Sequence, residues 1–258
     1  MTGKVVLLTG GGGVLGKVFA EALSELGANI FLIDIDAEGL IAAADDLKGK
    51  YQVGVEYKVL DLESPDQVAA VAVQVHKMFG RLDVLVNNAA FVGANNISGW
   101  VTDFPSQTLS TWRRALEVNL TSAFSLSQQC YPMLKESGNG VIINIGSIYG
   151  ELGPDMKLYK GTTMGNPAAY AASKGGLLQL TRWLSTVLAP EVRVNAISPG
   201  GVERDQPDVF CQRYIERTPL ARMANEEDFK GSIAYLASDL SRYVTGQNLV
   251  VDGGWSVW

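Results

Sequence analysis

The sequence predicts an α/β fold in which one mostly parallel, seven-stranded sheet carries helices on both faces. Short runs rich in β-branched residues alternate with longer stretches of helical periodicity, which is the pattern of repeated β-α-β units. With 258 residues, 47% of them hydrophobic, the chain can form one large α/β domain or two small ones. Because no linker, repeat or low-complexity segment divides it, we expect residues 1–258 to form a single domain.

Apolar, β-branched runs predict the strands, and helices fill the intervals between them. The runs lie at residues 4–9, 29–34, 53–60, 82–87, 140–146, 191–197 and 247–251. The helix after the third strand has the clearest start. Ser64 can cap it, Pro65 suits its first turn, and Gln67 can complete a capping box.

Composition and charge exclude several classes of protein. A net charge of -6 without any run of Lys or Arg argues against nucleic-acid binding. The first ten residues lack the apolar core of a signal peptide, and no stretch of about 18 apolar residues could cross a membrane, so we expect a cytoplasmic protein. Cys130, Cys211 and the sole histidine, His76, lack metal-ligand spacing, so we expect neither a metal site nor a His-based triad.

A glycine cluster, Gly10 to Gly13, joins the first strand to an amphipathic helix that includes Lys17 to Leu26. Glycines let a backbone approach its ligand closely, while the free N–H groups and the dipole at a helix start favour a pyrophosphate. A glycine cluster by itself is also consistent with a flexible loop. The strand before it, the helix after it and an acid at the end of the second strand favour a dinucleotide site, and therefore a doubly wound Rossmann fold.

The acid at the end of the second strand is Asp34, followed by Ile35. A carboxylate here can accept hydrogen bonds from both hydroxyls of the adenosine ribose, and it would repel a 2′-phosphate. No Arg or Lys follows at once, so the sequence favours NAD over NADP. If the strand ends two residues later, Asp36 would be the residue that accepts hydrogen bonds from the ribose.

Tyr170 and Lys174 lie four residues apart in a predicted helix, so their side chains share one face. Lowering the pKa of a tyrosine from about 10 to 7 needs roughly 4 kcal/mol. A cation about 4 to 5 Å away contributes roughly 3 to 4 kcal/mol at an effective dielectric constant of about 20. Tyr170 could therefore act as an acid or a base at neutral pH. Such a pair also arises by chance on many helices, so the rest of the chain must support this interpretation.

The chain resembles the short-chain dehydrogenase/reductase family over nearly its whole length. The motifs that carry the resemblance follow in order: Thr9, Gly10 and Gly16, Asp61-Leu62, Asn87-Asn88-Ala89-Ala90, Asn119, Ser147, Tyr170 with Lys174, Pro199-Gly200, and Thr245 to Gly254. The chain departs from the family where Val14 and Ala90 replace glycines and where Arg204 stands in place of a threonine. The resemblance implies hydride transfer between a nicotinamide and an alcohol or ketone.

The resemblance also implies a role for each matching residue. Ser147, at the end of the fifth strand, would polarise the substrate oxygen, and Tyr170 would donate or accept its proton. Lys174 would bind the nicotinamide ribose and lower the pKa of Tyr170, while Asn119 would hold a water in a proton relay. The residues expected to bind NAD are Thr9, Gly10, Gly13, Val14, Leu15, Gly16, Asp34, Ile35, Asp61, Leu62, Asn88, Ala89, Ala90, Tyr170, Lys174, Pro199, Gly200 and Val202.

Ser147 and Tyr170 stand about ten residues farther apart than the family pattern has them, which predicts an inserted loop near residues 150–167. A loop that leaves the chain between two active-site residues should shape the substrate pocket, although it could also be a surface excursion. Tyr159 is a rival for the catalytic phenol, but Thr163, and not a lysine, follows it by four residues.

A second variable segment, residues 203–218, combines Arg204, Arg213 and Arg217 with Phe210 and Tyr214. This mixture suits a polar or anionic substrate under a mobile lid, although a solvated helix face would look much the same. With the insertion, the chain is similar to bacterial oxidoreductases associated with nonulosonic acid sugars. We therefore predict a sugar-like substrate.

The helices expected at 110–137 and 167–188 carry apolar residues on more than one face, among them Leu177, Leu178, Leu180, Trp183 and Leu184. The resemblance implies that these helices pair between subunits, so we expect a homodimer or homotetramer, with Trp255 and Trp258 at another interface. Packing within one core would explain the same pattern.

Three functional classes remain after these observations. The set of Asn119, Ser147, Tyr170 and Lys174 favours an NAD-dependent enzyme acting on CH–OH groups. A redox sensor would need the cofactor crevice without turnover. A sugar epimerase or dehydratase on the same fold is disfavoured by the short carboxyl-terminal region.

Overall fold

A computed structural model describes residues 1–92 and 97–258. All seven predicted strands form one sheet, in the order β3-β2-β1-β4-β5-β6-β7, and every neighbouring pair is parallel. The strands are β1 (Val5–Thr9), β2 (Asn29–Asp34), β3 (Val55–Val59), β4 (Val84–Asn87), β5 (Gly140–Ile145), β6 (Val192–Pro199) and β7 (Asn248–Val251). The sheet order reverses between β1 and β4, so the carboxyl ends of these two strands border a crevice.

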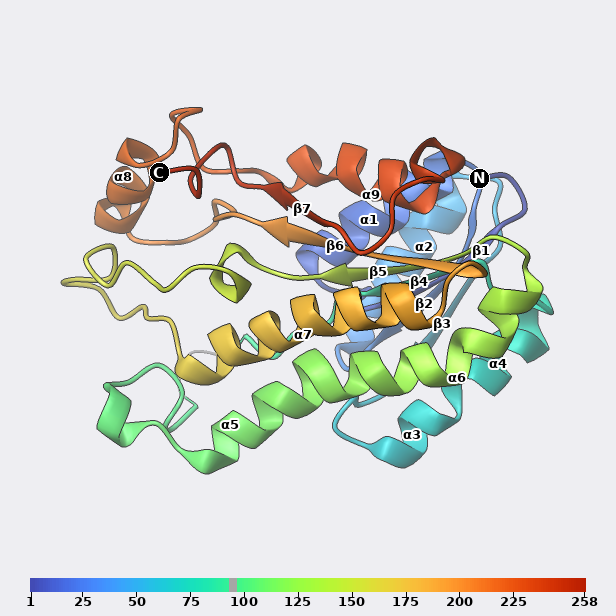
Figure 1. Ribbon diagram of the computed structural model, residues 1–258, viewed down its shortest axis with the longest axis horizontal. Helices are drawn as coiled ribbons and strands as arrows, with labels where there is room; N and C mark the ends of the chain where they lie inside the picture. The colour runs from blue at the N-terminus through green and yellow to red at the C-terminus, as the bar shows by residue number, and fades with distance from the viewer. Residues whose placement is uncertain (93–96) are drawn as a thin grey trace.

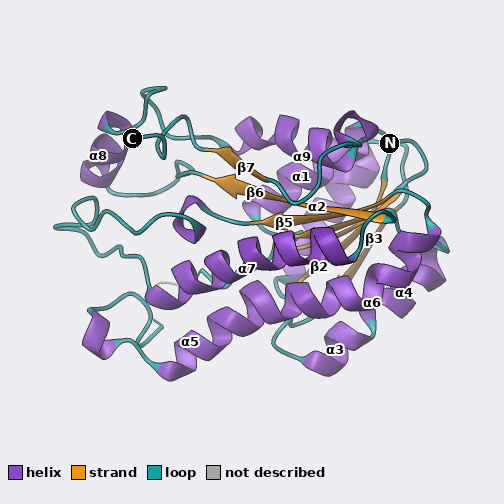
Figure 2. Cartoon of the chain, in the orientation of Figure 1, coloured by secondary structure: helices purple, strands orange, loops and turns teal. Residues whose placement is uncertain are grey.

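Helices cover both faces of the sheet (Figures 1 and 2). One face carries α1 (Val14–Glu25), α2 (Ala37–Lys50) and α9 (Lys230–Ala237). The other carries α3 (Pro65–Ala69), α4 (Val71–Phe79), α5 (Leu109–Leu116), α6 (Ser122–Glu136) and α7 (Ala168–Val187). The remaining helix, α8 (Asp208–Glu216), lies beyond the carboxyl ends of the strands, beside the projecting loop that precedes α7 (Figure 1).

Burial on two faces explains why the central strands are apolar throughout. Along β1, Val6 and Leu8 pack toward α1, whereas Val5 and Leu7 pack toward α4 and α6. Side chains alternate along a strand, so a strand covered on both sides needs apolar residues at every position.

Short helical turns complete the chain: the 3-10 helices η1 (Phe104–Ser106), η3 (Ile148–Gly150), η4 (Glu226–Phe229) and η5 (Asp239–Ser241), and a π-helical turn, η2 (Glu117–Thr121). The π turn joins α5 to α6, so the helix predicted at 110–137 is one helix with a bulge at Asn119. Single π turns are often found at functional sites.

The predicted capping box before α3 does not form. The Ser64 side chain makes no capping hydrogen bond, and the Gln67 side-chain oxygen instead accepts from the backbone N–H of Asp61 at 3.1 Å. The glutamine thus satisfies an N–H at the carboxyl end of β3, and α3 ends after five residues.

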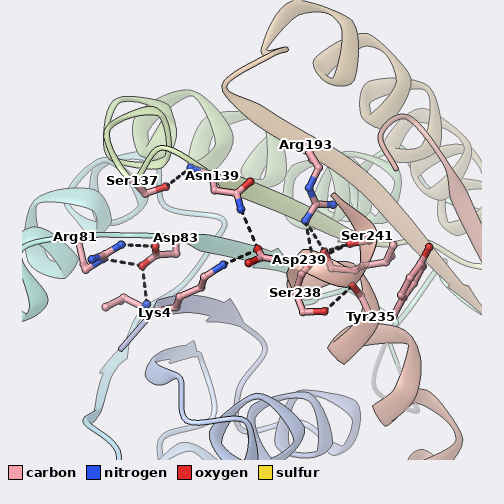
Figure 3. Close-up of polar contacts among 12 residues, drawn as sticks. Lys4, Arg81, Asp83, Ser137, Asn139, Arg193, Tyr235, Ser238, Asp239 and Ser241 are labelled. Carbon is pink, nitrogen blue, oxygen red and sulfur yellow. Dashed lines mark hydrogen bonds and ion pairs between the residues drawn. The ribbon is translucent and has the colours of Figure 1, made fainter. Parts of the chain in front are cut away.

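The amino end of the sheet is closed by polar contacts (Figure 3). The buried Asp83 accepts hydrogen bonds from the backbone N–H of Val5 at 2.8 Å and from Arg81 at 2.9 and 2.6 Å. Lys4 pairs with Asp239 at 3.2 Å, and Arg193 donates to the backbone carbonyls of Leu236 and Ser238 at the carboxyl end of α9. These contacts connect β1, β4 and β6 at the end of the sheet opposite the crevice.

Candidate active site

A cavity of about 580 Å³ lies at the carboxyl ends of the strands, where the sheet order reverses. Its walls come from the loop after β1, the ends of β2 to β6, and α7. Of the 18 residues that the sequence predicts to bind NAD, all line this cavity except Thr9.

Thr9 lies behind the cavity wall. Its hydroxyl accepts hydrogen bonds from the backbone N–H groups of Asn88 and Ala89, both at 2.9 Å. The Asn88 side chain donates in return to the carbonyl of Thr9 at 2.9 Å. Thr9 therefore connects β1 to the end of β4, and its buried side chain does not line the cavity.

The glycine loop passes close to other backbone at two points. Gly10 has φ of 69°, in the left-handed region that favours glycine, and a Cβ on Gly16 would collide with the carbonyl of Gly10. Val14, which replaces a family glycine, is the first residue of α1 and needs no left-handed conformation. The substitution therefore leaves the loop able to present the amino end of α1 to the cavity.

Asp34, and not Asp36, faces the cavity. Its carboxylate accepts hydrogen bonds from the N–H groups of Gly12 at 2.9 Å and of Asp36 at 3.0 Å. Asp36 caps α2 through the N–H of Gly39 at 3.1 Å. These two hydrogen bonds hold the Asp34 carboxylate against the glycine loop, in a position where it can bind a ribose.

The residues of the cavity that the sequence did not predict include Glu63, Phe91 and Arg114. The Arg114 guanidinium makes a bidentate pair with Glu63, at 2.8 to 3.0 Å, and stacks over the Phe91 ring at 4.7 Å from its centroid. No local pattern could have found them, because the fold brings Glu63 and Arg114 together across 51 residues.

Ser147 and Tyr170 face the cavity together, with Lys174 on the same helix face as Tyr170. The Ser147 hydroxyl accepts from the backbone N–H of Tyr149 at 3.2 Å, which fixes its rotamer at the end of β5. Burial raises the pKa of Tyr170, and the neighbouring Ser147 hydroxyl opposes that rise.

The expected lowering of the Tyr170 pKa by Lys174 does not appear in this structure, where burial has the largest effect on the pKa of the phenol. The Lys174 ammonium donates to the backbone carbonyl of Ile145 at 2.7 Å and lies 5.9 Å from the centroid of the Tyr170 ring. Burial also lowers the pKa of Lys174 to about 8, because an apolar surrounding disfavours the charged amine. The lysine is therefore held by the strand end and not by the phenol.

Asn119 does not line the cavity. Its side-chain oxygen accepts from the N–H of Phe91 at 2.6 Å, and its amide nitrogen donates to the Ser173 hydroxyl at 2.9 Å. The Asn119 side chain thus connects the π turn to the segment after β4 and to α7. It positions these two segments without facing the cavity.

The turn after β6 brings Pro199, Gly200 and Val202 to the cavity as predicted. Arg204, which replaces the family threonine, also lines it and makes a single long contact with Glu226 at 3.5 Å. It is the residue of this turn that carries a cation toward the cavity.

A second cavity of about 240 Å³ opens beside the first and shares Ser147 and Tyr170 with it. Its other walls include Tyr149 and, from the inserted loop, Tyr159. The loop predicted near 150–167 therefore shapes the active-site mouth. Tyr159 is not placed as the catalytic phenol, since its hydroxyl bonds to that of Tyr149 at 2.9 Å.

The arginines of the second variable segment do not face this cavity. Arg213 donates to three backbone carbonyls of the inserted loop, at 2.6 to 3.3 Å, and Arg217 pairs with Asp155 at 2.7 Å while lying over the Trp255 ring. The insertion itself thus binds both cations, and the polar or anionic substrate that this segment predicts stays a prediction.

The apolar faces expected to pair between subunits are only partly exposed. Leu177, Leu178 and Leu184 pack in their own core, whereas Trp183 is 53% exposed. Trp255 is buried within its own chain, which contradicts its placement at an interface.

The residues present fit a dinucleotide. The glycine loop leaves room that a Cβ would fill, the amino end of α1 faces the cavity, and a carboxylate stands at the end of β2. Among residues 1–92 and 97–258 no group of acids, histidines and cysteines could hold a metal ion, and no helix is long and apolar enough to cross a membrane.

Known proteins share this architecture. Residues 13–256 match the family model described as enoyl-(acyl carrier protein) reductase. A 3-oxoacyl-[acyl-carrier-protein] reductase of Thermotoga maritima is 33% identical over 98% of both chains. The trans-4-hydroxycyclohexanecarboxylate dehydrogenase of Sinomonas cyclohexanicum is 35% identical, over 97% of this chain and 92% of that one.

Solved structures agree with these relatives. The NADPH-dependent 3-quinuclidinone reductase from Rhodotorula rubra superposes with a TM-score of 0.88 at 28% identity, covering 100% of this chain and 93% of the other. An NAD+-bound xylitol dehydrogenase superposes with a TM-score of 0.87 at 31% identity, covering 98% and 99%. With its parallel sheet, its glycine loop and these relatives, the chain belongs to the short-chain dehydrogenase/reductase family of oxidoreductases, which act on CH–OH groups with a nicotinamide dinucleotide.

Proposed function

We propose that this chain is an NAD(H)-dependent oxidoreductase that interconverts an alcohol and a ketone of a neutral, sugar-like substrate. The main support for this proposal is that the two cavities share several lining residues. Among the residues that line both cavities, Ser147 and Tyr170 are the two that carry a hydroxyl, so a group bound in one cavity can meet a group bound in the other beside this serine and this phenol.

The residues of the wall suggest how protons move. In the reductive direction the Tyr170 phenol donates a proton to the substrate oxygen, and in the oxidative direction its phenolate removes the hydroxyl proton. Ser147 donates a hydrogen bond to the same oxygen. The nicotinamide, when bound, supplies or takes the hydride. Lys174, held by the Ile145 carbonyl, would bind the nicotinamide ribose.

Asn119 has a positioning role in this proposal. Its side chain is occupied by Phe91 and Ser173, so any water of a proton relay would bind to the backbone that the π turn opens and not to the amide. This refines the role that the resemblance implies.

Asp34 supports NAD as the cofactor. Its carboxylate lies in the cavity, held by two backbone N–H groups, where it would repel a 2′-phosphate. The three residues after it are Ile35, Asp36 and Ala37, which add no cation to bind that phosphate.

The substrate cavity supports a neutral ligand. No charged side chain from residues 1–92 or 97–258 lines it, whereas aromatic rings and phenol hydroxyls do. Aromatic faces and uncharged polar groups suit a sugar or polyol, which offers both C–H and O–H surfaces. The link to nonulosonic acid sugars stays a prediction. So do the single domain and the homo-oligomer, which the exposed Trp183 and Trp258 support.

A cofactor titration tests the proposal. NADH and NADPH are titrated separately by fluorescence against the wild type, Asp34→Ala and Asp36→Ala. We expect the wild type to bind NADH at least about tenfold more tightly, since a lost charged hydrogen bond is worth about 1.5 to 3 kcal/mol. Asp34→Ala should remove the preference, and Asp36→Ala, which alters a helix cap outside the cavity, should keep it. Tighter binding of NADPH by the wild type would contradict NAD. The preferred cofactor is then supplied with a panel of alcohols and ketones.

A further inference from the structure

Two phenols meet in the lining of the substrate cavity, which also includes Ser147 and Tyr170. Tyr149 follows Ser147 by two residues, and Tyr159 comes from the inserted loop. Their hydroxyls lie 2.9 Å apart, and both rings line the cavity. Nothing in the reaction proposed above uses either hydroxyl.

The pair has hydrogen-bonding capacity to spare. Each phenol has one O–H donor and can also accept, so one hydrogen bond between them uses one donor and leaves the other available. Burial raises the pKa of both tyrosines, so both remain neutral over the physiological range. The pair can therefore offer one O–H donor to a neutral polar group of a ligand.

Both phenols are fixed in position before any ligand arrives. The backbone N–H of Tyr149 donates to the Ser147 hydroxyl, and its ring packs edge-on against Trp255 at 6.3 Å. The Tyr159 ring packs against Phe210 at 5.5 Å, and the residue is only 8% exposed. Fixed polar groups lose little freedom on binding, which makes them effective for discrimination.

Packing of the insertion explains how Tyr159 is held. Arg213, on α8, donates to the carbonyls of Lys157, Leu158 and Lys160, which flank Tyr159 on both sides. The loop is thus bound to α8 by the residues next to the phenol, and its position does not depend on the ligand.

The cavity is also small. Its volume of about 240 Å³ is below the range of roughly 300 to 1,000 Å³ that holds drug-sized ligands. A compact ligand whose carbon–oxygen bond lies at Ser147 and Tyr170 is enclosed by the other lining residues of this small cavity, and the two phenols are among them.

We propose that Tyr149 and Tyr159 together bind a second hydroxyl of the substrate, so that the enzyme selects diols, polyols and hydroxyketones over simple alcohols and ketones. This inference rests on the proposed function, because it assigns the substrate class of that same site. A site built to hydrogen-bond a hydroxyl rejects the analogue that lacks it much more strongly than an apolar pocket rejects an extra group.

Tyr149→Phe and Tyr159→Phe test the proposal, because each removes a hydroxyl and keeps the ring that packs. The probes are cyclohexanol and the 1,2-, 1,3- and 1,4-cyclohexanediols, with NAD as oxidant and kcat/KM as the readout. We expect the wild type to prefer one diol over cyclohexanol by at least tenfold. In each variant the ratio of kcat/KM for the diol to kcat/KM for cyclohexanol should fall about tenfold, mainly through a higher KM for the diol. Tyr243→Phe, at a fully exposed tyrosine, is the matched control.

Two outcomes would overturn the inference: a wild type that favours cyclohexanol over every diol, or variants that lose the same activity on all alcohols. Oxidation of none of these alcohols, nor of xylitol, would instead contradict the proposed function. In that case the same alcohols are titrated against the enzyme–NADH complex by fluorescence. Diols that bind no better than cyclohexanol, or that bind equally well to the Phe variants, then overturn the inference without any need for turnover.

Discussion

The two cavities that meet at Ser147 and Tyr170 differ in the parts of the chain that form their walls. The cofactor cavity is made largely of backbone: a glycine loop, the amino end of α1 and the carboxyl ends of parallel strands. The substrate cavity is made of side chains from η3, the inserted loop and α8, which are far apart in the sequence. The charges differ as well, because acids and cations line the first cavity, whereas the described residues contribute none to the second.

This difference indicates which half of the site, the cofactor cavity or the substrate cavity, can change its residues without losing its function. Backbone contacts to a dinucleotide depend on the sheet and on a few glycines, so the fold itself maintains them. The substrate walls depend on aromatic packing and on the contacts of Arg213 and Arg217 with the insertion. Changes in the second half should therefore alter substrate choice and leave cofactor binding intact.

Tyr170→Phe provides the largest expected effect, because it removes the acid or base from the wall that both cavities share. We expect kcat/KM to fall about 10³-fold, within the usual range for general acid–base catalysis. NADH affinity should change less than about twofold, since the ring remains in place. Steady-state kinetics and a fluorescence titration measure the two effects, with Tyr243→Phe as the control. If NADH affinity fell by the same factor as kcat/KM, Tyr170 would act by binding the cofactor and not as the acid or base.

The pH dependence of the two directions should differ, because burial raises the pKa of Tyr170. Oxidation needs the phenolate, so its kcat/KM should rise about tenfold per pH unit from about pH 6 to 8, while the phenol is still mostly protonated. Reduction needs the phenol and should stay nearly flat over the same interval. Initial rates in both directions across this range check the sign. A reductive rate that falls as pH rises from 6 would mean that the pKa of Tyr170 is low in the complex.

Gly16→Ala tests the backbone construction of the cofactor half. The new Cβ would meet the carbonyl of Gly10, which is main chain and cannot move aside without shifting the loop. We expect NADH to bind about 10- to 100-fold more weakly, equivalent to roughly 1.4 to 2.8 kcal/mol. Gly49→Ala, in α2 with no neighbour near the added carbon, is the control. Unchanged NADH affinity in Gly16→Ala would show that the loop tolerates displacement.

Arg213→Ala tests the side-chain construction of the substrate half, with the smallest expected effect. Loss of the contacts to the insertion should raise KM for the best alcohol about five- to tenfold and leave the affinity for NADH unchanged. Hydrogen exchange should become faster in residues 153–165. Arg182→Ala removes an exposed arginine that contacts only Gln179 among the described residues, and serves as the control. An altered NADH affinity in Arg213→Ala would show that the two halves are coupled.

The sequence by itself predicted all seven strands and their parallel arrangement, and it identified most of the residues that line the larger of the two cavities described above. The reason is that these features are local. Hydrophobic runs define the strands, and a ligand at the carboxyl ends of parallel strands is contacted by residues that directly follow them, such as Gly10, Asp34 and Pro199.

The tertiary structure alone decided the rest of the site. It placed Thr9 and Asn119 behind the wall, tied Lys174 to the Ile145 carbonyl, and gave Arg213 a structural partner in the insertion. Each of these assignments depends on which hydrogen-bonding group lies within reach after folding, and that neighbour is often more than 25 residues away in the chain. The raised pKa of Tyr170 also depends on the tertiary structure, because its apolar surrounding exists only once the sheet and helices have packed around it.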